Sequence, residues 1–271
     1  MCRLYGFRSN SPRKVECELI RSQNALIVQS QRDERGESNP HGWGLGTYSR
    51  DEPCVERQAK PAYESDAFRW AAARVHACSV MAHVRRATVG RLRLENTHPF
   101  MHGAWLFAHN GTLGAFEQIR PRMVEAMTPH HRRAIQGETD SEHLFYLLLT
   151  LHEQQPATPL LPLLRQGLQQ VIDWSRQTDP KAEIALNTLW MDGEEIVGSR
   201  LGRSLWTVER KAVHPCEVCG GALHIQEDPG DAYRAVVVAS EPLTTTESWT
   251  KVPEGSLFRI DHSVRLHLEA F

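Results

Sequence analysis

The sequence has no long apolar run and little net charge, and each shortage excludes a class of protein. No run of about 18 apolar residues occurs, so we expect no membrane-spanning helix. The first residues lack the apolar segment of a secretory signal, which favours a cytoplasmic protein. The net charge is −2 with both signs interspersed, so no nucleic-acid partner is indicated.

Cysteine is also scarce, with six residues scattered over 271 positions. This pattern fits reduced thiols in the cytoplasm better than a disulfide framework. No internal repeat is visible, and 41% hydrophobic with 24% charged residues is an ordinary globular composition. A chain of this length can bury a large core without covalent cross-links.

The apolar pattern predicts strands toward both ends of the chain and helices between them. Strands are expected at 3–7, 41–48, 54–59, 80–84, 104–108, 182–191, 195–200, 205–208, 236–243, 255–260 and 264–268. Helices are expected at 13–31, 64–76, 115–135, from Thr139 onward and at 158–176. Strands and helices segregated in this way favour an α+β fold with largely antiparallel sheets.

The first chemical candidate is Cys2. If Met1 is removed, Cys2 carries both a thiol and a free α-amine. An α-amine has a pKa of about 7.7–8.0 and a thiol one of about 8.5, so both titrate near neutral pH. The amine can then accept the thiol proton and generate a nucleophile. The alternative is that Cys2 is only a small residue near the start of the chain.

A candidate anion site follows the apolar strand expected at 80–84, where Arg85, Arg86 and Thr88 come in close succession. A guanidinium can hold a carboxylate through two parallel N–H bonds, which an ammonium cannot do. The alternative is that both arginines are surface residues at the end of a strand.

Asn110 and Gly111 follow the strand expected at 104–108. Asn-Gly at the end of a strand is a common hairpin turn. However, an Asn side-chain amide and a Gly backbone N–H can also stabilise an oxyanion, and each such donor is worth about 2.7–4 kcal/mol. The sequence leaves both interpretations open.

Asp140 lies at the predicted start of a helix. Thr139 and Glu142 have the spacing of a capping box, which puts Asp140 in the first turn, where the helix dipole favours a carboxylate. Capping alone explains this residue, but a carboxylate fixed there would also suit a substrate ammonium group.

One Cys-x-x-Cys segment with flanking histidines lies in a possible loop or hairpin insertion at 209–231. Its candidate zinc ligands are His214, Cys216, Cys219 and His224. A closed zinc site needs four N or S ligands, and strong zinc signals pair two such clusters where this chain has one. We therefore favour an insertion with two free thiols, and we expect no metal and no other cofactor.

Taken together, Cys2 and the segments 83–88, 109–111 and 139–142 resemble the class II glutamine amidotransferases, which are N-terminal-nucleophile hydrolases. The likeness is greatest to short, stand-alone members such as the YafJ-like proteins and the ergothioneine-pathway γ-glutamyl hydrolases. The resemblance implies one domain over residues 2–271, built as a four-layer αββα sandwich with Cys2 between the two sheets.

The resemblance also implies a chemistry. Cys2 would attack the γ-carbonyl of a glutaminyl group while its α-amine relays the proton. Asn110 and Gly111 would hold the oxyanion. Ammonia or an amine would leave first, and water would then cleave the γ-glutamyl thioester.

Substrate recognition is implied for three more residues. Arg85, helped by Thr88, would bind the α-carboxylate, and Asp140 would bind the α-ammonium. Two positions depart from the family pattern. Val89 stands where the sugar-phosphate-aminating members have His, which puts one carboxylate contact in doubt, and His41 stands where the stand-alone members commonly have Asp.

We expect no ammonia-accepting domain in this polypeptide. Either a separate synthase subunit accepts the ammonia, or the substrate is a γ-glutamyl amide that is hydrolysed outright. A catalytically silent protein of the same fold, acting in binding or as a scaffold, is the alternative. Retention of Met1 would favour it, because a blocked amine cannot act as the base.

Overall fold

The computed structural model describes residues 2–49, 52–211 and 233–271. The strands of one sheet are β1 (Arg3–Arg13), β2 (Trp43–Ser49), β3 (Glu52–Gln58), β4 (Ala77–Val84), β9 (Trp206–Arg210), β10 (Ala235–Ala239) and β11 (Thr250–Lys251). Those of the other are β5 (Phe100–His102), β6 (Trp105–Leu113), β7 (Ile184–Met191), β8 (Ile196–Arg200), β12 (Ser256–Ile260) and β13 (Leu266–Ala270).

The described α-helices are α1 (Leu26–Gln31), α2 (Asp66–Arg74), α3 (Phe116–Ala126), α4 (Pro129–Ala134), α5 (Asp140–Gln154) and α6 (Leu160–Thr178). Short turns of other helix types are η1 (Cys17–Arg21), η2 (Ala62–Glu64) and η3 (Leu94–Asn96). Within the part of the chain that the structure describes, no helix combines the length and apolarity needed to span a membrane.

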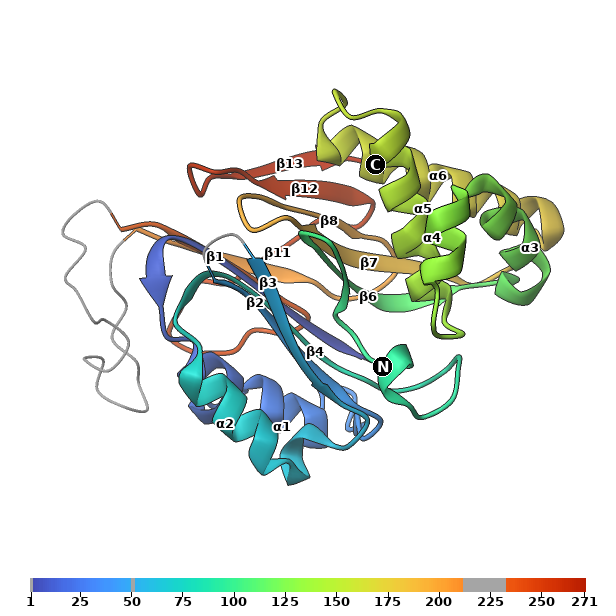
Figure 1. The fold of residues 1–271 in the computed structure, drawn as a ribbon. Helices are drawn as coiled ribbons and strands as arrows, with labels where there is room; N and C mark the ends of the chain where they lie inside the picture. The colour runs from blue at the N-terminus through green and yellow to red at the C-terminus, as the bar shows by residue number, and fades with distance from the viewer. Residues whose placement is uncertain (1, 50–51, 212–232) are drawn as a thin grey trace.

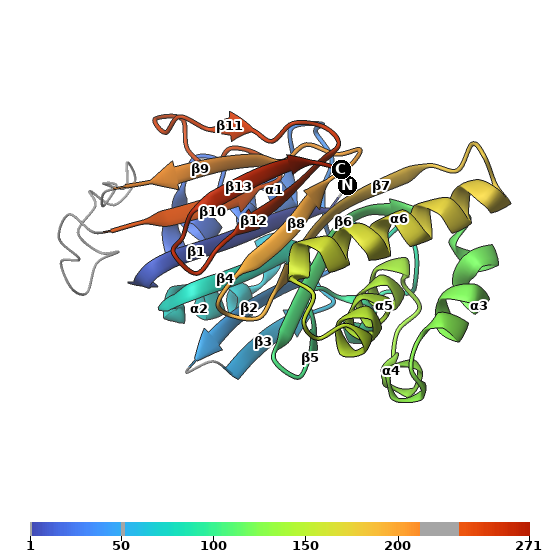
Figure 2. The ribbon, with the colours of Figure 1, turned by 90° about the horizontal axis from the view of Figure 1, so that it is seen from above.

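The strands form two sheets whose pairs are all antiparallel. The seven-stranded sheet has the order β11-β9-β10-β1-β4-β2-β3 and the six-stranded sheet β13-β12-β8-β7-β6-β5. Helices α1 and α2 cover the outer face of the first sheet, and α3 to α6 lie against the second (Figures 1 and 2). The predicted α+β sandwich is therefore confirmed.

The core has three apolar layers, one between the sheets and one under each set of helices. Side chains alternate along β1: Tyr5 and Phe7 pack toward α1 and α2, whereas Leu4 packs between the sheets. Cys2 directly precedes β1, and continuing this alternation by one step predicts that it lies on the Leu4 side, between the sheets.

The helix predicted at 13–31 is wrong. Strand β1 continues to Arg13, and the remaining residues form η1 and α1 with an extended break at Ser22. Tertiary contacts explain the break, because the Asn24 side chain donates to Glu241 Oε2 at 3.1 Å and to the Pro242 carbonyl at 2.8 Å. A helical apolar pattern did not outweigh these bonds.

The glycines of β2 mark a close approach of two backbones, as predicted. A Cβ on Gly44 would lie 2.0 Å from the His98 carbonyl oxygen. Strand β4 lies between β1 and β2 and is buried over 79–84, which explains its continuous apolar run. Its end delivers Arg85 to the edge of the sandwich where β1 begins.

Candidate active site

The Cys2 thiol contacts the backbone of Arg86. The Arg86 N–H donates to Cys2 Sγ at 3.2 Å, and the thiol faces the Arg86 carbonyl oxygen at 3.4 Å. Burial raises the pKa of the Cys2 thiol above its ordinary value, and the Arg86 N–H and the charges of Arg85 and Arg3 oppose that rise. Burial outweighs these contributions, so the pKa stays raised and the protonated thiol is favoured until a base removes its proton.

Arg85 is buried, with 2% of its surface exposed, so the surface interpretation is wrong for this residue. Its guanidinium donates to the carbonyl oxygens of Val89 at 2.8 Å and Arg91 at 3.2 Å. Burial lowers the pKa of Arg85, and the charges of Cys2 and Asp140 oppose that fall. The charges of Cys2 and of the Asp140 carboxylate thus both favour the charged form of Arg85.

Thr88 lies in the loop that wraps this guanidinium, but its side chain is exposed. Its hydroxyl makes no hydrogen bond to the rest of the described chain. Val89 contributes its carbonyl oxygen to Arg85, while its side chain packs against the apolar cluster under α5 and α6. A role for Thr88 in carboxylate binding remains a prediction.

Asn110 reaches from the second sheet to the start of β1. Its side-chain amide donates to Ser240 Oγ at 3.3 Å, and Ser240 Oγ also accepts the Leu4 N–H at 2.9 Å. Asn110 is 2% exposed and pairs with Asn187 of β7 inside the strand ladder. The hairpin-turn interpretation is therefore wrong, and Ser240 Oγ links the Asn110 amide to the N–H of Leu4, two residues after Cys2.

Gly111 follows in the same strand, and no other residue fits there. A Cβ would lie 1.8 Å from the Ala185 carbonyl oxygen and 2.5 Å from His109 Nε2. His109 is itself fixed by Ser141 Oγ at 2.9 Å and by Ala185 O at 3.0 Å. Packing alone thus requires glycine, and the oxyanion role remains a prediction.

Asp140 begins α5 and is 5% exposed. Its Oδ2 accepts the Leu113 N–H at 2.9 Å and its Oδ1 accepts the Ser141 N–H at 2.8 Å. The predicted N-cap is confirmed, since Thr139 Oγ1 accepts the Glu142 N–H at 3.2 Å. The Glu142 carboxylate accepts the N–H groups of Gln136 and Gly137. It therefore does not accept the Thr139 N–H, which would be the second bond of a capping box.

His41 supports the turn that carries the two arginines. Its Nδ1 accepts the Ala87 N–H at 2.8 Å, which requires a lone pair on that nitrogen. Burial lowers the pKa of His41, and the charges of Arg85 and Arg86 lower it further. The imidazole therefore makes a backbone contact within the turn that follows Arg85 and Arg86.

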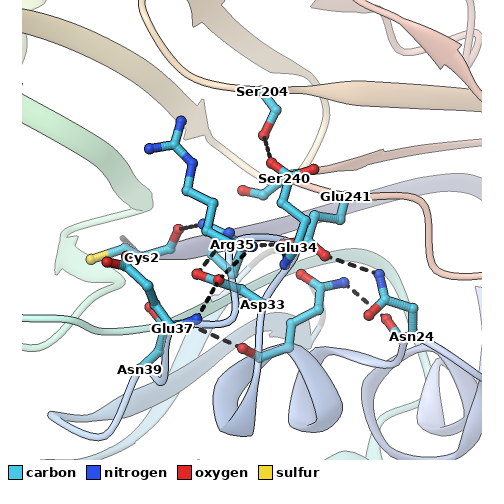
Figure 3. Close-up of polar contacts among 12 residues, drawn as sticks. Cys2, Asn24, Asp33, Glu34, Arg35, Glu37, Asn39, Ser204, Ser240 and Glu241 are labelled. Carbon is cyan, nitrogen blue, oxygen red and sulfur yellow. Dashed lines mark hydrogen bonds and ion pairs between the residues drawn. The ribbon is translucent and has the colours of Figure 1, made fainter.

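Sequence reasoning missed a buried ionic cluster behind Cys2 (Figure 3). Arg3 is 1% exposed and contacts Asp33 Oδ2 at 2.8 Å and Glu241 Oε1 at 2.5 Å. Its remaining nitrogen donates to the Cys2 carbonyl oxygen at 2.9 Å. An arginine at the start of the strand expected at 3–7, whose other residues are apolar or glycine, was the available signal, because a buried guanidinium requires partners.

The candidate zinc ligands His214, Cys216, Cys219 and His224 lie outside the described residues, as does the predicted insertion beyond residue 211. In the described chain, His130, His131 and Glu153 bring potential ligand atoms within 4.8 Å of one another. However, His131 Nδ1 already bonds Thr150 Oγ1 at 2.8 Å and Thr128 Oγ1 at 3.0 Å. We interpret this group as a hydrogen-bonded cluster.

The chain is similar in sequence to known proteins. DUG3 of Saccharomyces cerevisiae, a probable glutamine amidotransferase, is 29% identical over 304 residues, covering 98% of this chain and 84% of the yeast protein. A gamma-glutamyl-hercynylcysteine sulfoxide hydrolase of Mycobacterium tuberculosis is 33% identical over 264 residues, covering 96% of this chain and 93% of that protein.

The structural comparison concerns the fold. A class-II glutamine aminotransferase domain protein from Silicibacter pomeroyi has a TM-score of 0.66 at 22% identity, covering 100% of this chain and 99% of that one. The sequence family "Glutamine amidotransferases class-II" matches residues 1–268. Since this match spans nearly the whole chain, the protein belongs to the class-II glutamine amidotransferases.

Proposed function

We propose that the protein hydrolyses the γ-amide of glutamine or of another γ-glutamyl compound through a thioester on Cys2. The observation that carries the proposal is the arrangement of three groups. Cys2 Sγ accepts the Arg86 N–H at 3.2 Å, and the neighbouring Arg85 donates to the Val89 carbonyl oxygen at 2.8 Å. The loop that Arg85 binds is tied to the start of α5, because the Arg91 N–H donates to Glu138 Oε2 at 3.1 Å, two residues before Asp140. The nucleophile, the cation and the anion therefore lie on connected segments, which supports a common site.

The first half of the reaction forms the acyl-enzyme. After removal of Met1, the Cys2 α-amine takes the thiol proton and the sulfur attacks the γ-carbonyl carbon. The carbonyl oxygen becomes an oxyanion, and the Asn110 amide with the Gly111 N–H stabilises it. The C–N bond then breaks, and the α-ammonium returns the proton to the departing ammonia or amine.

The second half uses water. The α-amine deprotonates a water molecule, which attacks the thioester carbon. The sulfur leaves as a thiolate and recovers a proton from the α-ammonium, and glutamate is released. If a separate synthase subunit captures the ammonia, the first half reaction is unchanged and only the fate of the amine differs.

Recognition of the amino-acid head requires one cation and one anion. Arg85 is suited to the α-carboxylate because its Nε–H makes no hydrogen bond to the described chain, so the guanidinium keeps a donor for a ligand. Asp140 is suited to the α-ammonium because backbone N–H groups fix its carboxylate. Both side chains are held before substrate arrives.

A substrate panel with intact-mass analysis tests the proposal. We expect the purified protein to lack Met1 and to release glutamate from glutamine or from a larger γ-glutamyl amide. The name of the M. tuberculosis relative, a gamma-glutamyl-hercynylcysteine sulfoxide hydrolase, makes γ-glutamyl cysteine sulfoxides the first panel members. Cys2→Ala should abolish release, whereas Cys54→Ala, at an exposed thiol on β3, should not. Retained Met1 with no turnover would support a binding or scaffold role instead.

A further inference from the structure

Cys2 accepts hydrogen bonds at both ends: its carbonyl oxygen accepts one from Arg3, and its Sγ accepts one from the Arg86 N–H. We propose that Arg3, together with Asp33 and Glu241, positions the N-terminal nucleophile for attack. This inference rests on the function proposed above and assigns Arg3 as a positioning residue for that reaction. We call Arg3, Asp33 and Glu241 the Arg3 clamp.

Each nitrogen of the Arg3 guanidinium has a different partner. Nε donates to Glu241 Oε1 at 2.5 Å, Nη2 pairs with Asp33 Oδ2 at 2.8 Å, and Nη1 donates to Cys2 O at 2.9 Å. Only a planar, forked cation can satisfy three partners in these directions. A lysine ammonium would keep the charge and lose this geometry.

The two carboxylates are themselves fixed by backbone and amide donors. Glu241 Oε1 accepts the Glu34 N–H at 3.0 Å, and Asp33 Oδ1 accepts the N–H groups of Arg35 and Glu37 at 2.9 Å (Figure 3). These bonds tie the turn at 33–37 to the end of β10. The Arg3 clamp therefore fixes the Cys2 carbonyl group relative to the sheet.

The same turn also reaches the thiol side of Cys2. Glu37 forms an ion pair with Arg86, whose backbone N–H donates to Cys2 Sγ. Glu37 and Arg86 are 38% and 36% exposed in their side chains, so this outer pair contributes little by itself. The buried Arg3 clamp is the stronger half of a closed ring around Cys2.

Such a ring matters because amine, thiol and carbonyl share one α-carbon. Cys2 lies one residue before the first sheet pair, Arg3 with Val84, so the ladder does not extend to it. Holding the carbonyl limits rotation of the whole residue and fixes where the α-amine and Sγ point. A displacement of about 1 Å can cost 100-fold in rate.

The test compares Arg3→Lys and Arg3→Met with Arg8→Lys, a control at another β1 arginine, which bonds Ser79 away from the site. For each mature protein we would measure kcat, KM, the melting temperature and the pH profile of iodoacetamide alkylation of the N-terminal peptide. We expect Arg3→Lys to lower kcat about 10- to 100-fold with KM nearly unchanged. Arg8→Lys should match the wild type.

Alkylation separates this inference from the proposed function, because it needs no substrate. Arg3→Met removes a positive charge that lowers the pKa of the Cys2 thiol, so the alkylation midpoint should move to higher pH, whereas Arg3→Lys should keep the wild-type midpoint. Wild-type kcat in Arg3→Lys, or a lower melting temperature with unchanged kcat per folded molecule, would overturn the positioning role. If no γ-glutamyl compound turns over, an unshifted midpoint in Arg3→Met overturns it. If Arg3→Met fails to fold, Glu241→Gln takes its place with the same expected direction of kcat.

Discussion

The stability of the protein should fall in mild acid because of His83. This residue lies in β4 with 0% exposure, and its ring centroid is 4.3 Å from that of His98, with the two ring planes tilted by 34°. Neither ring nitrogen of His83 has a hydrogen-bond partner in the described chain. Burial, with the charges of Arg85 and His109, lowers the pKa of His83 from 6.5 to about 3. Between about pH 3 and pH 6.5, therefore, the His83 imidazole is neutral in the folded protein and protonated in the unfolded chain.

The sign and size of the effect follow from proton linkage. Between pH 6.5 and pH 3 the unfolded state binds one more proton at His83 than the folded state. Folding stability therefore falls as the pH falls through this window, by about 1.4 kcal/mol per unit. Moving from pH 7 to pH 5 should cost about 2 kcal/mol from this residue alone.

The assay is urea unfolding at pH 7 and pH 5, followed by tryptophan fluorescence. His83→Met removes the titrating group, so its loss of stability between the two pH values should be smaller than that of the wild type by about 2 kcal/mol. His262→Gln, at an exposed histidine, should behave like the wild type. An equal loss in wild type and His83→Met would refute the reasoning.

Three further predictions concern the site. Cys2→Ala should abolish turnover with a melting temperature near that of the wild type, and residual hydrolysis by this variant would exclude the thioester route. Arg85→Lys should raise KM strongly, since one ammonium cannot replace a fork bound to three loop carbonyls; steady-state kinetics with an unchanged KM would remove Arg85 from carboxylate recognition. Asn110→Ala should lower kcat about 100- to 1,000-fold at similar KM, and a loss below about threefold would argue against an oxyanion contact.

Most of the fold could be predicted because its signals are local. The alternation of apolar residues gave the main strands, and the apolar stripe expected at 158–176 corresponds to α6 at Leu160–Thr178. Asp192-Gly193 does turn β7 into β8, with Gly193 at φ 99°. Secondary structure that a short local segment determines could therefore be predicted from the sequence.

Positions decided by distant partners were not readable. Arg3 and Glu241 are 238 residues apart in sequence, and the pairing of β1 with β10 brings their side chains together. Asn110-Gly111 carries a strong turn signal, yet pairing with β7 extends the strand to Leu113. In both cases long-range strand pairing, which the local pattern does not encode, outweighs the local preference.

Val89, which stands where the sugar-phosphate-aminating members have His, contributes its backbone and not its side chain to the hold on Arg85. The loop after Arg85 is held by backbone carbonyl oxygens, including that of Val89 at 2.8 Å. Every residue type carries such an oxygen, so exchange of the side chain at 89 leaves this hold on Arg85 intact. The same reasoning applies to exposed Thr88. We expect differences in substrate to involve the half-exposed side chains around the turn that contacts the thiol, namely Arg86, its ion-pair partner Glu37, and His41, whose Nδ1 accepts the Ala87 N–H. An exchange of His41 for Asp should change the preferred leaving group in the γ-glutamyl panel and leave the KM for the shared amino-acid head nearly constant; an unchanged preference would locate specificity elsewhere.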